Sequence, residues 1–203
     1  MRKTLLLLVC LCACVSVSAK SRFGLTAGIT TSRLVLEEEG IKSSTVFAGG
    51  LVFKQPLALG FVIQPELLFN TKGVNRENEL FNDNIRVSYL ELPVQLQWGV
   101  DLIALRPYIF AEPFIGYALA GKYNDKNDPQ GGLSDMSGAK SRFEYGIGAG
   151  AGIEVGDRIQ LSAKYYWNLE DFDYYDETYG WIYHDYKDCR GARGFSVMLT
   201  FLF

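Results

Sequence analysis

Gly194-Phe-Ser-Val-Met-Leu-Thr-Phe-Leu-Phe203, the last ten residues, carry the pattern that decides the fold. Every second residue from Phe195 to Phe203 is apolar, as expected for one face of a β-strand, whose side chains point alternately to opposite sides. A soluble domain would need a further protein layer to cover five such residues. The wall of a transmembrane barrel needs this face, because lipid covers it.

The first 19 residues are predicted to be a secretory signal peptide. Arg2 and Lys3 precede an apolar run, Thr4–Val17, and small residues precede a cleavage position at Lys20. That run is shorter than the roughly 20 residues that a transmembrane helix needs. A lipoprotein signal with Leu11-Cys-Ala-Cys14 as its processing site is the alternative, but a terminal barrel strand does not require a lipid anchor.

The composition of residues 20–203, the predicted mature barrel domain, excludes several classes of protein. Without Arg2 and Lys3, the 20 Lys and Arg fall to 18 against 23 Asp and Glu, a net charge of −5 that argues against nucleic-acid binding. Cys189 is the one cysteine left, so no intramolecular disulfide is expected. No apolar run reaches the length of a spanning helix, so any membrane crossing requires a closed barrel.

Two segments before the C-terminal strand alternate most clearly. Residues 143–155 place apolar side chains at odd positions and Gly or Glu at even positions, and residues 158–170 repeat the scheme after a tight turn at Gly156-Asp157. Arg158, Lys164 and Glu170 lie on the polar face of the second segment. Charges at mid-strand opposite an unbroken apolar face fit lipid outside and a polar lumen inside.

Five further strands bring the total to eight. They are predicted near residues 22–30, 45–53, 59–72, 86–99 and 106–121. The connections 54–58, 100–105 and 156–157 are short, whereas 31–44, 73–85, 122–141 and 171–193 are long and polar. This alternation predicts an all-β, eight-stranded antiparallel up-and-down transmembrane β-barrel, with its N-terminus on the periplasmic side and its long loops outside.

Three prolines fall inside predicted strands, although proline removes a donor from the hydrogen-bond ladder. Pro65, Pro93 and Pro113 would lie at similar heights on adjacent strands, with Glu66, Glu91 and Glu112 at the same level. Our hypothesis is a shared bulge or kink that turns these carboxylates into the lumen.

Several segments resemble the PorT-like outer-membrane β-barrel family. They are Gln64-Pro-Glu-Leu-Leu-Phe69, Tyr89-Leu-Glu-Leu-Pro-Val94, Arg106-Pro-Tyr-Ile-Phe110, Phe143-Glu-Tyr-Gly-Ile-Gly-Ala-Gly150 and the C-terminal strand. The resemblance covers nearly all of residues 20–203 and implies a small eight-stranded barrel in a Gram-negative outer membrane. It implies no shared catalytic set, and one branch of the family is tied to a protein-secretion apparatus.

The lumen is the first candidate site. The spacing of Gly146, Gly148, Gly150 and Gly152 resembles the dinucleotide-binding motif. That motif requires a turn that leads into a helix, and the sequence here predicts a strand instead. We interpret the four glycines as space for large side chains such as Arg158, Lys164 and Tyr166. A polar network is predicted from Glu66, Glu91, Glu144, Glu154, Arg158 and Lys164. Ion pairs that stabilise the interior are expected there rather than acid–base chemistry, because buried charges need partners.

The last long loop is the second candidate site. It combines acidic residues with aromatic residues that are candidates for partner contact: Tyr174, Tyr175, Tyr179, Trp181, Tyr183 and Tyr186. A solvated hairpin and a calcium site are the alternatives, but the spacing does not match the twelve-residue calcium loop. The one histidine, His184, has Asp185 beside it and no defined nucleophile, so no catalytic residue is assigned.

The predicted function is structural or interaction-based. The barrel is expected to present its loops to a protein or glycan partner and not to act as a general diffusion pore, because eight strands leave an interior just wide enough for side chains. A secretion-apparatus component and a lipid or peptide hydrolase are the alternatives, and a soluble lipid carrier would need the two faces reversed. No enzyme activity, cofactor, metal or nucleic acid is expected. The expected partners are outer-membrane lipid and the barrel-assembly machinery, which would recognise the C-terminal strand.

Overall fold

All secondary structure in the described residues is β. The computed structural model describes residues 20–35, 41–77, 82–125, 133–134, 142–169 and 190–203, so the predicted signal peptide lies outside them. The strands are β1 (Arg22–Val35), β2 (Ile41–Pro56), β3 (Phe61–Glu77), β4 (Asn82–Gly99), β5 (Leu105–Asp125), β6 (Leu133–Ser134), β7 (Phe143–Val155), β8 (Ile159–Asn168) and β9 (Arg190–Leu202). Within these ranges, no helix has the length and apolar character needed to cross a membrane.

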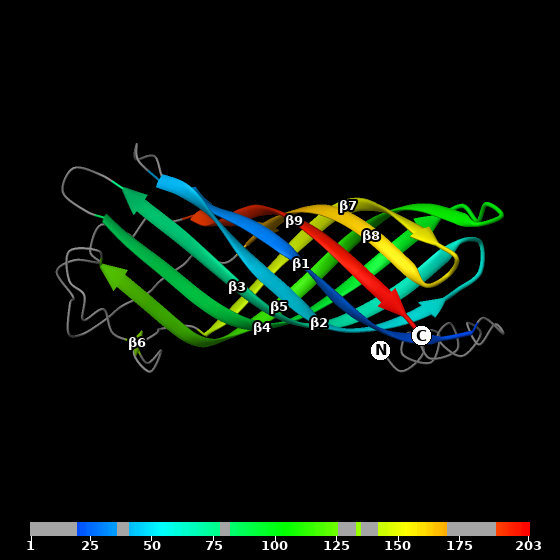
Figure 1. Ribbon diagram of the computed structural model, residues 1–203, viewed down its shortest axis with the longest axis horizontal. Helices are drawn as coiled ribbons and strands as arrows, with labels where there is room; N and C mark the ends of the chain where they lie inside the picture. Colours follow the sequence, from blue (N-terminus) through cyan, green and yellow to red (C-terminus); the bar gives the residue numbers. More distant parts are fainter. Residues whose placement is uncertain (1–19, 36–40, 78–81, 126–132, 135–141, 170–189) are drawn as a thin grey trace, which may run out of the picture.

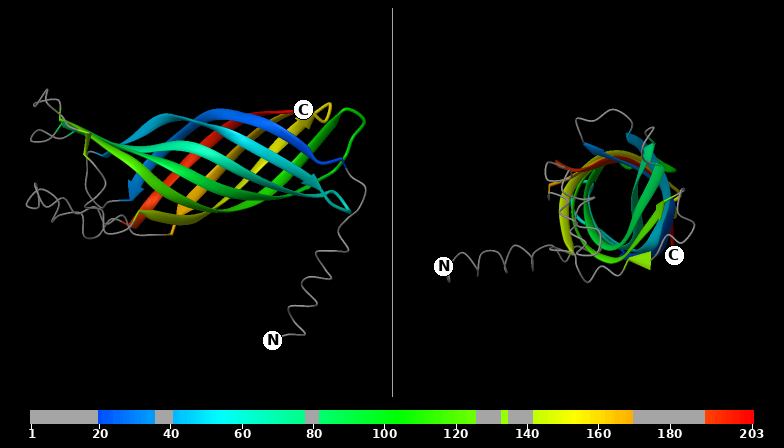
Figure 2. Two further views of the ribbon diagram at one scale, coloured as in Figure 1. Left: turned by 90° about the horizontal axis from the view of Figure 1, so that it is seen from below. Right: turned by 90° about the vertical axis from the view of Figure 1, so that its left-hand side faces the viewer.

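Eight of the strands close into one antiparallel barrel. Each long strand pairs with the next along the chain, and β7 follows β5 in the ring because the two-residue β6 only adds to β5. β1 then pairs with β9, which joins the two ends of the sheet. Figure 1 shows the slanted strands running the length of the molecule, and Figure 2 shows the closed ring end-on. The predicted eight-stranded up-and-down barrel is confirmed.

The two ends of the barrel differ. The short-turn end holds the connections 57–60, 100–104 and 156–158 together with Phe203, whose N–H donates to the carbonyl of Phe23 at 2.9 Å. At the opposite end, the overhang end, the strands run further than predicted, and residues 31–35, 41–44, 73–77, 82–85 and 122–125 are strand rather than loop. Antiparallel partners keep pairing there, as in Val74–Ile85, so the ladder continues through polar sequence.

Outward and inward residues alternate along each strand. Outward apolar side chains form a band around the barrel: Phe23, Leu25 and Ile29 on β1, Phe47 and Leu51 on β2, Leu90, Leu92, Leu96 and Trp98 on β4, Ile147 and Ile153 on β7, and Phe195, Leu199 and Phe201 on β9. At the overhang end the band gives way to hydroxyl pairs, with Thr31 and Thr45 at 3.1 Å and Thr71 and Ser88 at 3.4 Å. The band therefore has two polar edges, as a lipid-covered belt requires.

Aromatic pairs lie near both edges of this band. Phe23 and Phe53 are in contact near the short-turn end, with ring centroids 4.9 Å apart. Toward the overhang end, Tyr165 and Trp167 lie 4.8 Å apart and Tyr117 and Phe143 lie 5.1 Å apart. Girdles of aromatic residues at both interfaces are typical of outer-membrane barrels.

The three prolines lie within strands, and Glu66, Glu91 and Glu112 are buried in the lumen as predicted, but the predicted shared bulge is wrong. Pairing of β3 with β4 stops at Pro65–Val94 and resumes at Leu68–Glu91 in the same register. The register shift of β4 against β5 lies elsewhere, between Ser88 and Tyr89. Each proline removes one donor, so hydrogen bonds are lost locally, and flanking pairs hold the register.

The glycine stripe of β7 makes room for side chains, but not those predicted. A Cβ on Gly146 would lie 2.4 Å from the ring of Phe114, and one on Gly150 would lie 2.7 Å from Phe110. These rings come from β5, the neighbour of β7 on the side away from β8. Tyr166 of β8 instead lies over Gly194 of β9, because alternate side chains lean across the next strand.

Replacing Gly150 with alanine is expected to destabilise the barrel by about 1–3 kcal/mol, because overpacking forces the backbone to move. Its Cβ would lie 2.2 Å from the carbonyl oxygen of Ala163. Gly148 is the matched control, because its nearest atom would be 3.5 Å away. Urea unfolding in micelles measures both variants, and equal stabilities would contradict the packing described.

Candidate functional site

The candidate site is the interior of the barrel, where charged side chains from six strands meet. In the described part of the chain, nine acidic or basic residues face the lumen: Lys54, Glu66, Lys72, Glu91, Arg106, Glu112, Glu144 and Glu154 are buried, and the side chain of Lys164 is 11% exposed. In the described residues this set gives five carboxylates against four bases, a formal charge of −1. Charges removed from water need partners, so their pairing determines what the lumen can do.

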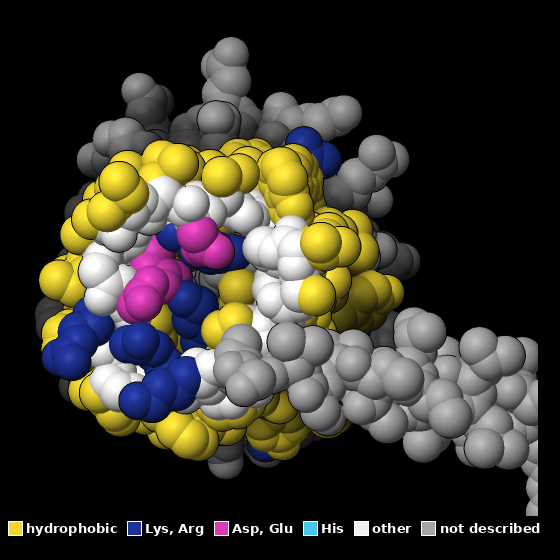
Figure 3. All heavy atoms as spheres, turned by 90° about the vertical axis from the view of Figure 1, so that its right-hand side faces the viewer, with side chains coloured by type: hydrophobic (Ala, Val, Ile, Leu, Met, Phe, Trp, Pro, Cys, Tyr) yellow, Lys and Arg dark blue, Asp and Glu magenta, His cyan; other side chains and the backbone are white. Residues whose placement is uncertain are grey.

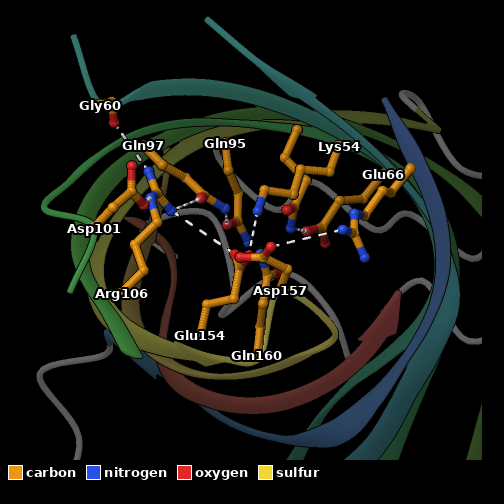
Figure 4. A network of polar contacts seen from close by, with 12 residues as sticks. Lys54, Gly60, Glu66, Gln95, Gln97, Asp101, Arg106, Glu154, Asp157 and Gln160 are labelled. Atoms are coloured by element: carbon orange, nitrogen blue, oxygen red, sulfur yellow. Dashed lines mark hydrogen bonds and ion pairs between the residues drawn. The ribbon is translucent and has the colours of Figure 1, made fainter. Parts of the chain in front are cut away.

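Glu154 of β7 is the centre of the first cluster, near the short-turn end. It forms an ion pair with Lys54, accepts a hydrogen bond from Gln160 at 2.8 Å and lies 3.9 Å from Arg106. In the ring order β2 and β7 lie four strands apart in either direction, so the Lys54–Glu154 pair spans the full width of the lumen. Figure 4 shows these side chains converging from opposite walls.

Arg106 connects this cluster to two turns. Its guanidinium donates to Gln97 at 3.1 Å and to the carbonyl of Gly60 at 3.0 Å, and it lies 3.5 Å from Asp101. Gly60 and Asp101 belong to the two turns that flank β3 and β4 (Figure 4). The planar guanidinium makes these contacts simultaneously, so Arg106 links the two turns to the Glu154 cluster in the lumen.

Lys72 of β3 is the centre of a second cluster, toward the overhang end. Its ammonium lies 2.8 Å from Glu91 and 2.6 Å from Glu144. The rings of Tyr89, Phe114 and Tyr166 surround the same ammonium, with centroids 5.2, 4.8 and 5.2 Å away. Two carboxylates and three aromatic faces therefore surround the Lys72 ammonium.

Glu112 and Lys164 form the third group, between the other two. The Lys164 ammonium contacts one oxygen of Glu112 in an ion pair. Glu66 interacts electrostatically with both residues, but in the described structure its hydrogen-bond donor is an amide, Gln64 at 2.9 Å.

The structure brings together five of the six residues predicted for the lumen network. Glu66, Glu91, Glu144, Glu154 and Lys164 belong to the three groups, whereas Arg158 is exposed beside the β7–β8 turn. Sequence reasoning missed Lys54, Lys72 and Arg106 as lumen residues. The alternation itself could have found Lys72 and Arg106, because each lies an even number of residues from a lumen glutamate on its own strand.

Figure 3 looks into the short-turn end. Apolar side chains form the outer rim, and acidic and basic side chains gather inside a hollowed mouth. The reverse arrangement, with apolar residues inside and charges outside, would be expected of a soluble lipid carrier. The observed polarity is that of a barrel surrounded by lipid.

The other candidate residues lie outside the described residues. These are the partner-contact aromatics Tyr174, Tyr175, Tyr179, Trp181, Tyr183 and Tyr186, together with His184 and Cys189. In the part of the chain that is described, no three His, Cys, Asp or Glu residues gather in a group that could hold a metal ion.

Comparison with solved structures finds several outer-membrane proteins to which the chain is similar. Among solved structures, the chain is similar to Ail of Yersinia pestis, with 12% identity, 91% of this chain and 100% of that chain covered, and a TM-score of 0.46. Neisserial surface protein A is similar over 91% of this chain and 100% of that chain, with 11% identity and a TM-score of 0.47. The outer membrane enzyme PagL is similar over 86% and 98%, with 9% identity and a TM-score of 0.42. No curated protein matches the sequence.

The family match covers most of the chain. The model of the outer membrane protein beta-barrel domain matches residues 16–174, which include β1 to β8. The closed ring, the apolar belt and the charged lumen agree with that match. The chain therefore belongs to the outer membrane protein beta-barrel domain family and is located in the outer membrane.

Proposed function

We propose that this protein is a closed outer-membrane scaffold that presents its overhang end to a protein or glycan partner, and that it is neither a diffusion pore nor an enzyme. The observation that carries the proposal is the Lys54–Glu154 pair, which spans the lumen. Eight-stranded barrels have an interior that side chains fill, and here charged side chains cross it.

The order of charges along the lumen also supports a closed barrel. Lys54 and Arg106 are balanced by Glu154 and Asp101 near the short-turn end, which leaves no formal net charge in that cluster. The Lys72 cluster, with two carboxylates, has a formal charge of −1. The Lys72 cluster would therefore repel a mobile anion in a narrow, low-dielectric interior.

Strand extension supports presentation of the overhang end. β3, β4 and β5 have 17, 18 and 21 residues, whereas about 9–11 residues suffice to cross a bilayer. The excess lies beyond the hydroxyl pairs that end the apolar band. By the usual orientation of such barrels, short turns face the periplasm, so these extensions reach outside the cell.

The composition of residues 170–189 indicates the kind of partner. The segment contains seven acidic residues among its aromatics: Glu170, Asp171, Asp173, Asp176, Glu177, Asp185 and Asp188. Electrostatic complementarity disfavours a polyanionic glycan and favours a basic protein surface or a neutral sugar that stacks on Tyr and Trp.

Affinity capture from intact outer membranes tests this proposal. The full chain is expected to retain a partner that a variant lacking residues 170–189 loses. The deletion spares Arg190–Arg193 because Arg193 pairs with Trp167 and Arg33, so the barrel itself stays intact. A second variant keeps the length of the loop and replaces the six candidate contact residues, Tyr174, Tyr175, Tyr179, Trp181, Tyr183 and Tyr186, with serine. Equal capture by all three proteins would contradict the proposal, as would sugar-driven swelling of liposomes that contain the full chain.

The identity of the captured partner and an activity assay separate the alternatives. We infer that the chain belongs to the PorT-like family, and capture of secretion components would favour membership of the branch that is tied to a protein-secretion apparatus. A hydrolase activity that His184→Ala abolishes would favour the enzyme instead. Recognition of β9 by the barrel-assembly machinery also stays a prediction.

A further inference from the structure

The rim of the barrel at the short-turn end has two different halves. The turns 57–60 and 100–104 join β2 to β3 and β4 to β5, which are neighbouring pairs in the ring, and their sequences are Leu-Ala-Leu-Gly and Val-Asp-Leu-Ile-Ala. The start of β1, the end of β9 and the β7–β8 turn form the other half of the rim. That half carries Lys20, Arg22, Asp157 and Arg158.

Large apolar side chains are exposed on the first half of the rim, which we call the apolar half. Leu59 is 88% exposed, Ile103 is fully exposed, and Leu102 is exposed beside it. Asp101 is the one charged residue of the two turns, and its carboxylate lies 3.5 Å from Arg106 at the mouth of the lumen (Figure 4). An exposed apolar patch of this kind marks a surface that contacts protein or lipid.

Leu59 occupies a backbone position that disfavours leucine. The N–H of Phe61 donates to the carbonyl of Ala58 at 3.2 Å and closes a turn whose central residues, Leu59 and Gly60, have φ of 61° and 79°. Such turns favour Asn or Asp before Gly, and a positive φ strains a bulky residue. The β7–β8 turn has Gly and Asp at its two positive-φ positions. The strain at Leu59 therefore indicates a role for its side chain outside the turn.

The apolar half is continuous with the lipid-covered band. Phe61 and Trp98 pair across β3 and β4, are exposed on the outer wall and lie within two residues of the turns. On β1, by contrast, exposed Lys20 and Ser21 precede the first outward apolar residue, Phe23. Figures 1 and 2 show the two apolar turns projecting further along the barrel than the β7–β8 turn, drawn in yellow. An upright barrel would therefore hold Leu59 and Ile103 in water.

We propose that the barrel is tilted in the membrane, so that Leu59, Leu102 and Ile103 insert at the boundary between headgroups and acyl chains of the periplasmic leaflet. The occupant of the apolar half is then phospholipid, and the charged half of the rim lies in water. A transmembrane segment whose apolar length exceeds the bilayer thickness commonly tilts to bury it. At this boundary apolar side chains enter the lipid while the backbone of the turns stays hydrated.

Fluorescent labels at single cysteines test the tilt. Leu59→Cys, Ile103→Cys and Asp157→Cys, each combined with Cys189→Ser, are labelled with an environment-sensitive fluorophore in vesicles of phosphatidylethanolamine and phosphatidylglycerol. Labels at 59 and 103 are expected to be quenched by nitroxide-bearing lipid and to be several-fold less sensitive than the label at 157 to iodide on both sides of the membrane.

Equal quenching by iodide at the three positions would overturn the proposal. Protection of positions 59 and 103 in native outer membranes but not in these vesicles would also overturn it, because a periplasmic protein would then be the occupant.

Stability in the same vesicles gives a second readout. The side chain of Ile103 is fully exposed in the described structure, so a loss of stability on its replacement has to come from a contact outside the barrel. Ile103→Ser is expected to lower the urea midpoint of unfolding. Asp157→Asn, on the charged half, should leave the midpoint unchanged, because an exposed ion pair contributes little. An unchanged midpoint for Ile103→Ser would show that Ile103 lies in water and would overturn the proposal.

Discussion

Lys54→Met is expected to lower the free energy of unfolding by about 3–5 kcal/mol, because it leaves the buried carboxylate of Glu154 without its ion-pair partner. Glu154 then keeps the hydrogen bond from Gln160 at 2.8 Å and the more distant Arg106 at 3.9 Å. Urea unfolding in micelles, followed by tryptophan fluorescence, measures the loss.

The double variant Lys54→Met with Glu154→Leu is the matched control. Removing both charges leaves no uncompensated carboxylate, so the double variant should be more stable than Lys54→Met alone. If the single variant loses less than about 1 kcal/mol, the pair is hydrated rather than buried, and the closed lumen is wrong.

The second large effect is expected on the outside of the barrel. Leu51→Lys places an ammonium in the middle of the apolar band of β2, where it pairs with Leu25 and Leu67. A lysine at the bilayer midplane costs about 2–4 kcal/mol in such barrels. The yield of folded barrel in outer membranes and its stability in lipid vesicles should both fall.

Thr45→Lys is the control on the same strand and the same face. Thr45 is exposed and lies at the polar edge of the band, where it contacts Thr31. A lysine near the interface costs about 0–1 kcal/mol, so this variant should insert normally. Equal losses in the two variants would show that the charge disturbs the strand rather than a lipid contact.

The sequence was sufficient for the architecture because alternation is a local signal. The residues from Phe143 to Val155 point alternately out and in whatever their neighbours are, and the structure has the same bounds for β7. The turn at Gly156-Asp157 was readable for the same reason. Both residues have positive φ, which a two-residue hairpin turn of this kind requires.

Strand ends were less predictable because pairing, rather than hydrophobicity, extends them. Residues 73–77 look like loop in the sequence, yet they continue β3 because β4 supplies a partner for each. The same reasoning explains Lys54, which was placed in a turn. Its strand continues to Pro56, and the register with β1 and β3 directs its side chain into the lumen.

The pairing of charges could not be predicted, because it depends on distances across the barrel. Glu91 and Glu144 share Lys72, which lies on a third strand and was not a candidate. Arg158 has the right parity for the lumen but stands at the mouth, where the interior opens to solvent. The alternation of residues along a strand predicts which side chains face the lumen. Which of these charges form pairs depends on their positions along the barrel axis.

Spin labels along β9 test the central claim, that lipid covers the outward face, most directly. Labels at positions 195, 197, 199 and 201 in lipid vesicles should be accessible to oxygen, which dissolves in the bilayer, and shielded from a water-soluble nickel reagent. Labels at 196, 198 and 200 should be poorly accessible to both. Equal accessibility at all positions, or an oxygen maximum at the even positions, would contradict the membrane barrel.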